Sequence, residues 1–137
     1  MTGLVFADTL YWLAITKPGD PYAGRARDAR SILGAIQLIT TEAVLAEFLN
    51  AFSKAIPRLR AHAAHMARTI LNSQDVLTIP VDTPLFSEAL RLFESRADKN
   101  YSMVDCISMV IMKRQRINRV LTNDHGFQQE GYTILIV

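Results

Sequence analysis

The chain has 137 residues, half of them hydrophobic, which is enough for one globular domain with a substantial core. Fifteen Lys and Arg residues against thirteen Asp and Glu residues give a formal net charge of +2, which permits a phosphate-bearing partner without requiring one. The single cysteine excludes an intramolecular disulfide, and no apolar run approaches the roughly 18 residues that a membrane span needs. We therefore expect a cytoplasmic protein without a membrane partner, built as a single domain over residues 1–137.

The first half of the chain alternates apolar runs with segments of helical periodicity. Residues 3–7, "GLVFA", predict a short buried strand, and the loop 16–21 contains two prolines and a glycine. A helix is expected over 22–36 and a second strand over 37–40. In 41–56 the apolar residues recur at the spacing of an amphipathic helix that begins after two threonines.

The second half continues in the same way. The sequence predicts a helix over 58–72, a strand over 76–80 and a helix over 84–97 that opens with a proline. The stretch 101–114, "YSMVDCISMVIMKR", is apolar almost all round apart from Asp105, which predicts a helix buried inside the domain. Two further strands are expected, at 119–122 and at 132–137.

Strands that are separated by helical segments indicate βαβ units. Such units build a mainly parallel sheet with helices on both faces, so the predicted fold class is α/β with five strands in the central sheet. In sheets of this kind, functional sites gather beyond the carboxyl ends of the strands, where the strand order reverses. The residues that follow each predicted strand are therefore the first candidates for a functional site.

Four carboxylates stand near predicted strand ends. Asp8 follows the first strand directly, and Asp124 lies two residues past the fourth. Glu47 lies about two turns into the helix after the second strand, and Asp105 lies in the first turn of the buried helix. If these side chains converge, they cannot all stay ionised without a counter-charge, and Mg²⁺ or Mn²⁺ is the natural partner for oxygen ligands. A pair of such ions stabilises the attacking and leaving oxygens in phosphodiester hydrolysis.

Each carboxylate also has an ordinary structural interpretation. Asp105 has the spacing of a capping box with Ser102, and Asp8 has the position of an N-cap for a helix that follows it. Asp124 has the sequence context of a turn residue, and Glu47 that of a solvated glutamate near the apolar stripe. Taken singly, the structural role is the more common one; the joint placement is what indicates a metal site.

Basic residues gather after the buried helix, and His125 follows Asp124 directly. Basic residues at a helix end either complement the helix dipole or contact a phosphate backbone, and both interpretations stay open. Arg114 and Arg116 are the candidates for substrate binding in this group. A lone loop histidine is more often structural, so His125 is a weaker candidate for a substrate contact. The basic group consists of Lys113, Arg114, Arg116 and Arg119.

The stretches "VFADTLYWLA", "ITTEAVLAEFLN" and "DKNYSMVDCISMVIM" followed by "VLTNDHGF" occur in this order along the chain. In that order they resemble the PIN-domain family, and within it the VapC-type toxins of bacterial and archaeal toxin–antitoxin pairs. The resemblance spans essentially the whole chain. It implies a PIN-like α/β/α sandwich on a mainly parallel five-stranded sheet, in which acidic residues bind Mg²⁺ or Mn²⁺ and cut RNA.

By position, the resemblance assigns catalytic and metal-binding roles to Asp8, Glu47, Asp105 and Asp124. It also implies that the hydroxyl of Thr122 holds a metal-bound water or a phosphate. As partners it implies an RNA substrate, a second copy of the chain in a homodimer, and a small antitoxin protein whose basic side chain enters the acidic pocket.

Three further positions bear on this assignment. Glu42 competes with Glu47, but the two lie roughly 140° apart on a helix, and the apolar stripe favours Glu47. Asp98 lies just before the buried helix and is a loop carboxylate that could assist. Many relatives carry a further acid where this chain has Gly126, so we expect a second metal ion to be held weakly.

The expected activity is hydrolysis of RNA phosphodiester bonds by a Mg²⁺- or Mn²⁺-dependent endoribonuclease, the toxin of a type II toxin–antitoxin pair. A non-catalytic RNA- or partner-binding module with the same fold stays open as the alternative. A receiver or a haloacid-dehalogenase-like phosphatase is disfavoured, because Asp8 is followed by Thr9 and Leu10 and not by the paired acids or the D-x-D motif of those proteins.

Overall fold

The computed structural model describes residues 3–137 and consists of a five-stranded sheet with helices packed around it. Every neighbouring pair of strands is parallel, and the strand order is β3-β2-β1-β4-β5. The strands are β1 (Leu4–Ala7), β2 (Gln37–Thr41), β3 (Val76–Ile79), β4 (Arg119–Leu121) and β5 (Thr133–Ile134). The helices are α1 (Thr9–Thr16), α2 (Ala23–Leu33), α3 (Glu42–Asn50), α4 (Pro57–Asn72), α5 (Thr83–Ser95), α6 (Met103–Gln115) and α7 (His125–Gln129).

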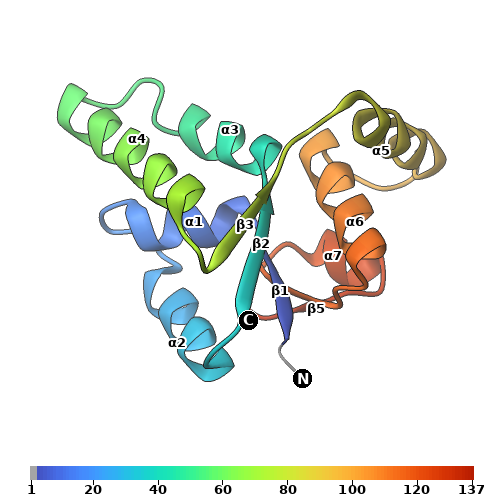
Figure 1. Cartoon of the computed structure of the whole chain (residues 1–137), viewed down its shortest axis with the longest axis horizontal. Coiled ribbons are helices and arrows are strands. Elements are labelled where there is room, and N and C mark those ends of the chain that lie inside the picture. Colours follow the sequence, from blue (N-terminus) through green and yellow to red (C-terminus); the bar gives the residue numbers. More distant parts are fainter. Residues whose placement is uncertain (1–2) are drawn as a thin grey trace.

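The strand order explains why the helices lie on both faces of the sheet. From β1 the chain moves outward through β2 to β3, then returns across the sheet and places β4 and β5 on the other side of β1. Because crossovers between parallel strands are right-handed, reversing the direction of travel moves the connecting helices to the opposite face. Figure 1 shows α1, α2 and α4 on one side of the sheet and α5, α6 and α7 on the other. The α/β/α sandwich that the sequence predicted is thus confirmed, and the sheet is fully parallel.

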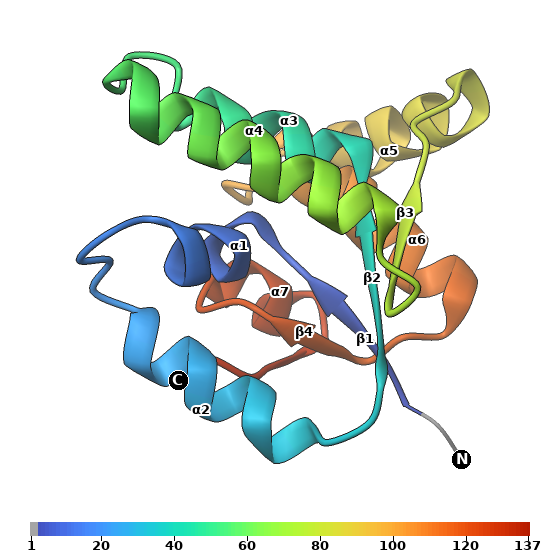
Figure 2. The ribbon, with the colours of Figure 1, turned by 60° about the vertical axis from the view of Figure 1, so that its left-hand side comes forward.

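The reversal of strand order lies between β1 and β4, which lie side by side in the middle of the sheet (Figure 2). These two strands pair in register through Phe6 with Val120 and Ala7 with Leu121, and the backbone N–H of Asp8 donates to the Leu121 carbonyl at 3.3 Å. The carboxyl ends of β1 and β4 therefore stand side by side, which is the place where parallel sheets build ligand sites.

The apolar runs of the sequence form the buried core of the structure. Strands β1 and β4 are central, so both of their faces are buried and they read as continuous apolar runs. Helix α6 is buried from Cys106 to Met112 without interruption, as its all-round apolar sequence predicted. Among residues 3–137, no helix is long and apolar enough to cross a membrane.

Some element boundaries differ from the sequence-based prediction. The helix expected over 41–56 ends at Asn50, and Pro57 then opens α4, because proline is favoured in the first turn of a helix and disfavoured inside one. The strand expected over 132–137 covers only Thr133–Ile134. Residues 125–129 were given no element but form α7, a single turn that is too short for a hydrophobic period to show.

Candidate active site

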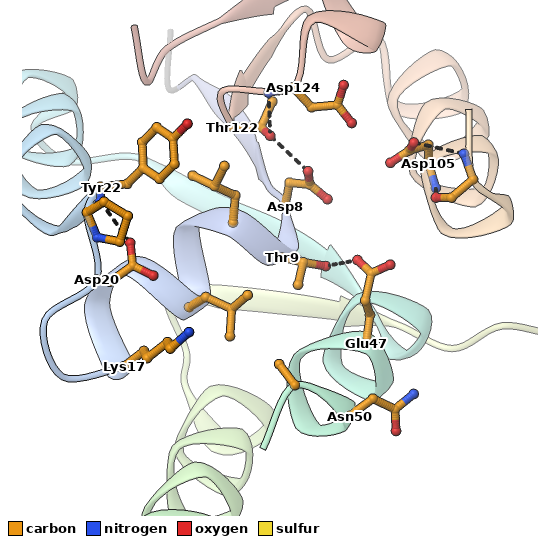
Figure 3. A pocket seen from close by; sticks show the side chains of 15 residues that line it. Asp8, Thr9, Lys17, Asp20, Tyr22, Glu47, Asn50, Asp105, Thr122 and Asp124 are labelled. Carbon is orange, nitrogen blue, oxygen red and sulfur yellow. Dashed lines mark hydrogen bonds between the residues drawn. The ribbon is translucent and has the colours of Figure 1, made fainter. Parts of the chain in front are cut away.

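The four candidate carboxylates line one pocket of about 810 Å³ at the carboxyl ends of β1 and β4. Asp8 follows β1, Glu47 projects from α3, Asp105 from the first turn of α6, and Asp124 follows β4. Figure 3 shows their carboxylates facing a common space. Thr122 also lines this pocket, so the structure brings together five of the predicted site residues.

Asp8 is the most buried of the four, with 5% of its surface exposed. The Thr122 hydroxyl donates to its Oδ2 at 2.9 Å, and the backbone N–H of Asp124 donates to the Thr122 Oγ1 at 3.2 Å. Within residues 3–137, the other oxygen of Asp8, Oδ1, is buried and has no hydrogen-bond partner. A buried carboxylate oxygen without a partner is unfavourable, and a bound cation removes that penalty.

Asp105 closes the capping box that the sequence predicted for α6. The Ser102 hydroxyl accepts from the Asp105 backbone N–H at 3.0 Å, and Asp105 Oδ2 accepts from the Ser102 backbone N–H at 2.9 Å. The cap uses one carboxylate oxygen, so the structural role leaves the second oxygen for another ligand. Figure 3 shows the Asp105 carboxylate on the side of the pocket opposite Tyr22.

The other two carboxylates are held in the same way. The Thr9 hydroxyl donates to Glu47 Oε1, and Glu47 stands on a helix whose first turn is capped by the side chain of Thr41. Asp124 caps α7, since its Oδ1 accepts from the Gly126 backbone N–H at 2.8 Å. In the described part of the chain, each of the four acids has one oxygen in a structural hydrogen bond and one oxygen without one.

The electrostatics reflect four acids with little compensating charge. The pKa of Asp8 is raised to about 7, mainly by burial and in smaller part by the nearby charges of Asp105 and Glu47, while the adjacent backbone N–H of Thr9 and the Thr122 hydroxyl favour the charged form and oppose the rise. Burial likewise raises the pKa of Asp105 to about 6, with contributions from the charges of Asp124 and Glu47. Both shifts have the sign that a divalent cation would reverse.

The donor set fits a hard cation. It consists of carboxylate oxygens, the ligand type that Mg²⁺ and Mn²⁺ prefer, and it includes the unpartnered Oδ1 of Asp8. As the side chains of residues 3–137 stand, no three acidic, histidine or cysteine residues are already arranged around one point for an ion. Ion binding would therefore draw the free oxygens of the acids inward.

The family model for the PIN domain matches residues 5–130. The chain belongs to the PIN domain family. Among curated relatives, this PIN domain is 26% identical over 129 residues to the 23S rRNA-specific endonuclease VapC20 of Mycobacterium tuberculosis, an alignment that covers 94% of this chain and 95% of the relative. The resemblance to the PIN family that the sequence motifs carry is thereby confirmed.

Solved structures share the fold of this PIN domain. The crystal structure of M. tuberculosis VapC20, described as a sarcin-ricin loop cleaving toxin, superposes with a TM-score of 0.84 at 23% identity and covers 94% of this chain and 96% of the other. FitAcB from Neisseria gonorrhoeae superposes with a TM-score of 0.63 at 15% identity and covers 96% of each chain. At these identities the likeness supports the fold.

The competing acids of the PIN domain are separated by the structure. Glu42 lies outside the pocket, where its Oε1 accepts from the Val81 backbone N–H at 2.9 Å, so Glu47 is the glutamate that faces the site. Asp98 lines a different cavity and pairs with Lys99 at 3.6 Å.

The predicted basic contacts are not brought to the carboxylates. Arg114 and Arg116 lie at the C-terminal end of α6, whereas Asp105 lies in its first turn. Arg114 pairs with Glu88 at 2.7 Å, and Arg116 ends the helix in a left-handed conformation with φ 56°. Any phosphate that these arginines contact would therefore lie away from the acidic pocket, and their role in substrate binding stays a prediction.

Sequence reasoning missed several residues that line the pocket. Asn50 stands one turn after Glu47 on α3, and this i, i+3 spacing could have identified it. The loop between α1 and α2 contributes Lys17 and Tyr22, and it is fixed to the site because the Tyr22 hydroxyl donates to Asn123 Oδ1 at 3.2 Å. No local signal in the sequence places that loop at the pocket. The missed lining residues include Thr9, Lys17, Asp20, Tyr22 and Asn50.

Proposed function

We propose that this PIN domain is a Mg²⁺- or Mn²⁺-dependent endoribonuclease and the toxin of a type II toxin–antitoxin pair. The observation that carries the proposal is the acidic pocket, in which four carboxylates from separate elements each keep one oxygen free of structural hydrogen bonds. A purely structural site gains nothing from a buried, unpartnered oxygen such as Oδ1 of Asp8.

In this proposal Asp8, Asp105 and Asp124 hold the ion, and the Thr122 hydroxyl fixes the orientation of Asp8. When bound, the cation supplies positive charge for the phosphate oxygens as negative charge develops on them. Glu47 either holds the ion as well or accepts a proton from the attacking water. A new bond from the water oxygen to phosphorus and loss of the bond to the 3′ oxygen leave a 5′-phosphate and a 3′-hydroxyl.

The named relatives support the proposed substrate class and toxin role. VapC20 is named as an endonuclease specific for 23S rRNA and as a toxin, and the sequence match extends over nearly the whole of both chains. On that basis we assign an RNA substrate in the cytoplasm and an antitoxin protein that places a basic side chain among the four carboxylates. We also assign a homodimer, on the resemblance to VapC-type toxins.

Calorimetric titration with Mn²⁺ tests the metal site. We expect the wild-type protein to bind the ion and the Asp105→Asn protein to lose most of that binding while its circular dichroism spectrum stays unchanged. The Ser102→Ala protein is the matched control, because it loses the hydroxyl half of the α6 capping box but keeps the Asp105 carboxylate. Equal binding by wild type and Asp105→Asn would remove Asp105 from the site.

RNA cleavage tests the activity. We expect cleavage that requires Mg²⁺ or Mn²⁺ and is lost in the Asp8→Asn protein, and Asp28→Asn on the exposed face of α2 serves as the control. Undiminished cleavage by the Asp8→Asn protein would overturn the assignment of the acidic pocket. Specific RNA binding without cleavage by the wild type would favour the non-catalytic module instead.

A further inference from the structure

A second cavity adjoins the acidic pocket at Asp124. It has a volume of about 340 Å³ and lies between the loop that precedes α6 and the turn of helix α7. Asp124 lines both cavities, so a group that enters the second cavity lies beside the proposed reacting phosphate. A cavity of this size matches the lower range of small-ligand pockets.

The walls of this cavity offer neutral hydrogen-bonding groups. Asn100 and Gln129 each contribute a side-chain amide, which both donates and accepts. The imidazole of His125 is held by a contact of 3.0 Å between its Nδ1 and Gln128 Oε1. The remaining charged pair, Asp98 and Lys99, is 3.6 Å apart and largely offsets itself.

The balance of charge argues against an anion in this cavity. Lys99 is the one basic residue in the described lining, apart from the histidine, and it faces Asp98, while Asp124 adds a negative charge. A phosphate site normally presents unpaired arginine or lysine side chains or a row of backbone N–H groups. A flat, neutral ligand with donors and acceptors on its edge suits these walls better.

Tyr101 gives the cavity a rigid aromatic wall. Its hydroxyl donates to Glu130 Oε1 at 3.0 Å, and Glu130 is fixed in turn by an ion pair of 2.8 Å with Arg96. Gly126 packs closely against the ring, because a Cβ at that position would lie 3.2 Å from the ring carbons Cδ1 and Cε1, and only 6% of the Tyr101 surface is exposed. Tyr101 therefore supports the cavity as a rigid, buried side chain and offers little ring surface to a ligand.

We propose that this cavity is a base pocket, which takes the nucleobase of a nucleotide next to the cleaved phosphodiester bond. The inference rests on the proposed ribonuclease function. Sequence-specific proteins read single-stranded RNA by contacting unstacked bases with aromatic side chains and by hydrogen bonds to the base edges. In this cavity the exposed amides of Asn100 and Gln129 are the groups that read the edge of the base. These two residues then determine sequence specificity without taking part in the chemistry.

The test is the base preference of cleavage, measured by sequencing the products of a randomised single-stranded RNA library. We expect the wild type to prefer one base at a position flanking the cleaved bond, and Asn100→Ala or Gln129→Ala to reduce this preference by about tenfold, the effect of losing one amide–base contact. Both side chains are exposed, so both variants should fold. Gln74→Ala, an exposed glutamine outside the base pocket, is the matched control and should keep the preference.

A second substrate separates recognition of the base from recognition of the backbone. Replacing the preferred nucleotide by an abasic one should lower the cleavage rate of the wild type by about tenfold. Cleavage with the same base preference in wild type, Asn100→Ala and Gln129→Ala would overturn the base pocket and leave the ribonuclease proposal standing. A wild type that cleaves no RNA in Mg²⁺ or Mn²⁺ would overturn both.

Discussion

Replacing Asp8 by Asn removes a negative charge that the fold buries at an energetic cost. The folded protein raises the pKa of Asp8 from 3.8 to about 7, mainly through burial. Between these two pH values the folded state binds a proton that the unfolded state has already released, so stability falls as the pH rises. Above the folded pKa, the full free-energy cost of burying the ionised carboxylate applies. Each pKa unit corresponds to about 1.4 kcal/mol, so this cost is about 4 kcal/mol.

The Asp8→Asn protein avoids this cost. With a chelator present, the Asp8→Asn protein should have a larger free energy of unfolding than the wild type. This stability difference should be larger by about 3 kcal/mol at about pH 8 than at about pH 5. Urea unfolding at the two pH values measures this difference, and Asp28→Asn on the exposed face of α2 should show no such growth.

Adding Mn²⁺ at about pH 8 should make the wild type more stable than the Asp8→Asn protein. An ion that binds only the folded state stabilises it according to its concentration and affinity, so the wild type should gain stability and the Asp8→Asn protein should gain little. If the stability difference between Asp8→Asn and the wild type is the same at both pH values, the conclusion that a buried ionised carboxylate limits stability is refuted. A gain with Mn²⁺ that is equal in both proteins would refute the role of Asp8 as a ligand.

Three further substitutions test the local structure. Ser102→Ala should lower the free energy of unfolding by about 1 kcal/mol in a urea titration, because α6 loses half of its capping box; an unchanged midpoint would contradict this role. Phe48→Ala should lose about 3–5 kcal/mol in the same assay, since the ring is fully buried against Phe52, and a loss below about 1 kcal/mol would count against that packing. Arg116→Gly should stabilise the protein by about 0.5–1 kcal/mol and raise its melting temperature, because glycine adopts the left-handed φ of 56° freely. A lower melting temperature would show that contacts of the arginine side chain stabilise the protein by more than the backbone strain destabilises it.

The parts of the fold that the sequence predicted are those governed by local or one-dimensional signals. The buried strands β1 and β4 appear as apolar runs, and the capping box of α6 appears as a Ser and an Asp three residues apart. Because every strand of the sheet is parallel, residues after β1 and β4 had to reach the same edge, which is why Asp8 and Asp124 could be paired from the sequence.

What the sequence did not predict depends on contacts between distant segments. The loop that carries Lys17 and Tyr22 is held to the pocket by a hydrogen bond to Asn123, which lies 101 residues from Tyr22. Arg114 is likewise held by its pair with Glu88 on α5, which lies 26 residues away in the sequence. Hydrophobic periodicity carries no information on such pairs.

The structural and functional interpretations of the four acids turn out to describe different atoms of the same side chains. Asp105 and Asp124 cap helices with one oxygen, and Asp8 and Glu47 accept from threonine hydroxyls with one oxygen. Each of these bonds restrains its side chain through one oxygen and leaves the second oxygen for a ligand. Restraining a side chain lowers the conformational entropy that an ion must remove on binding. A substitution that removes the hydrogen-bond donor to one of these oxygens should therefore weaken Mn²⁺ binding in a calorimetric titration, whereas Ser102→Ala keeps the backbone donor to Asp105 and should keep that binding.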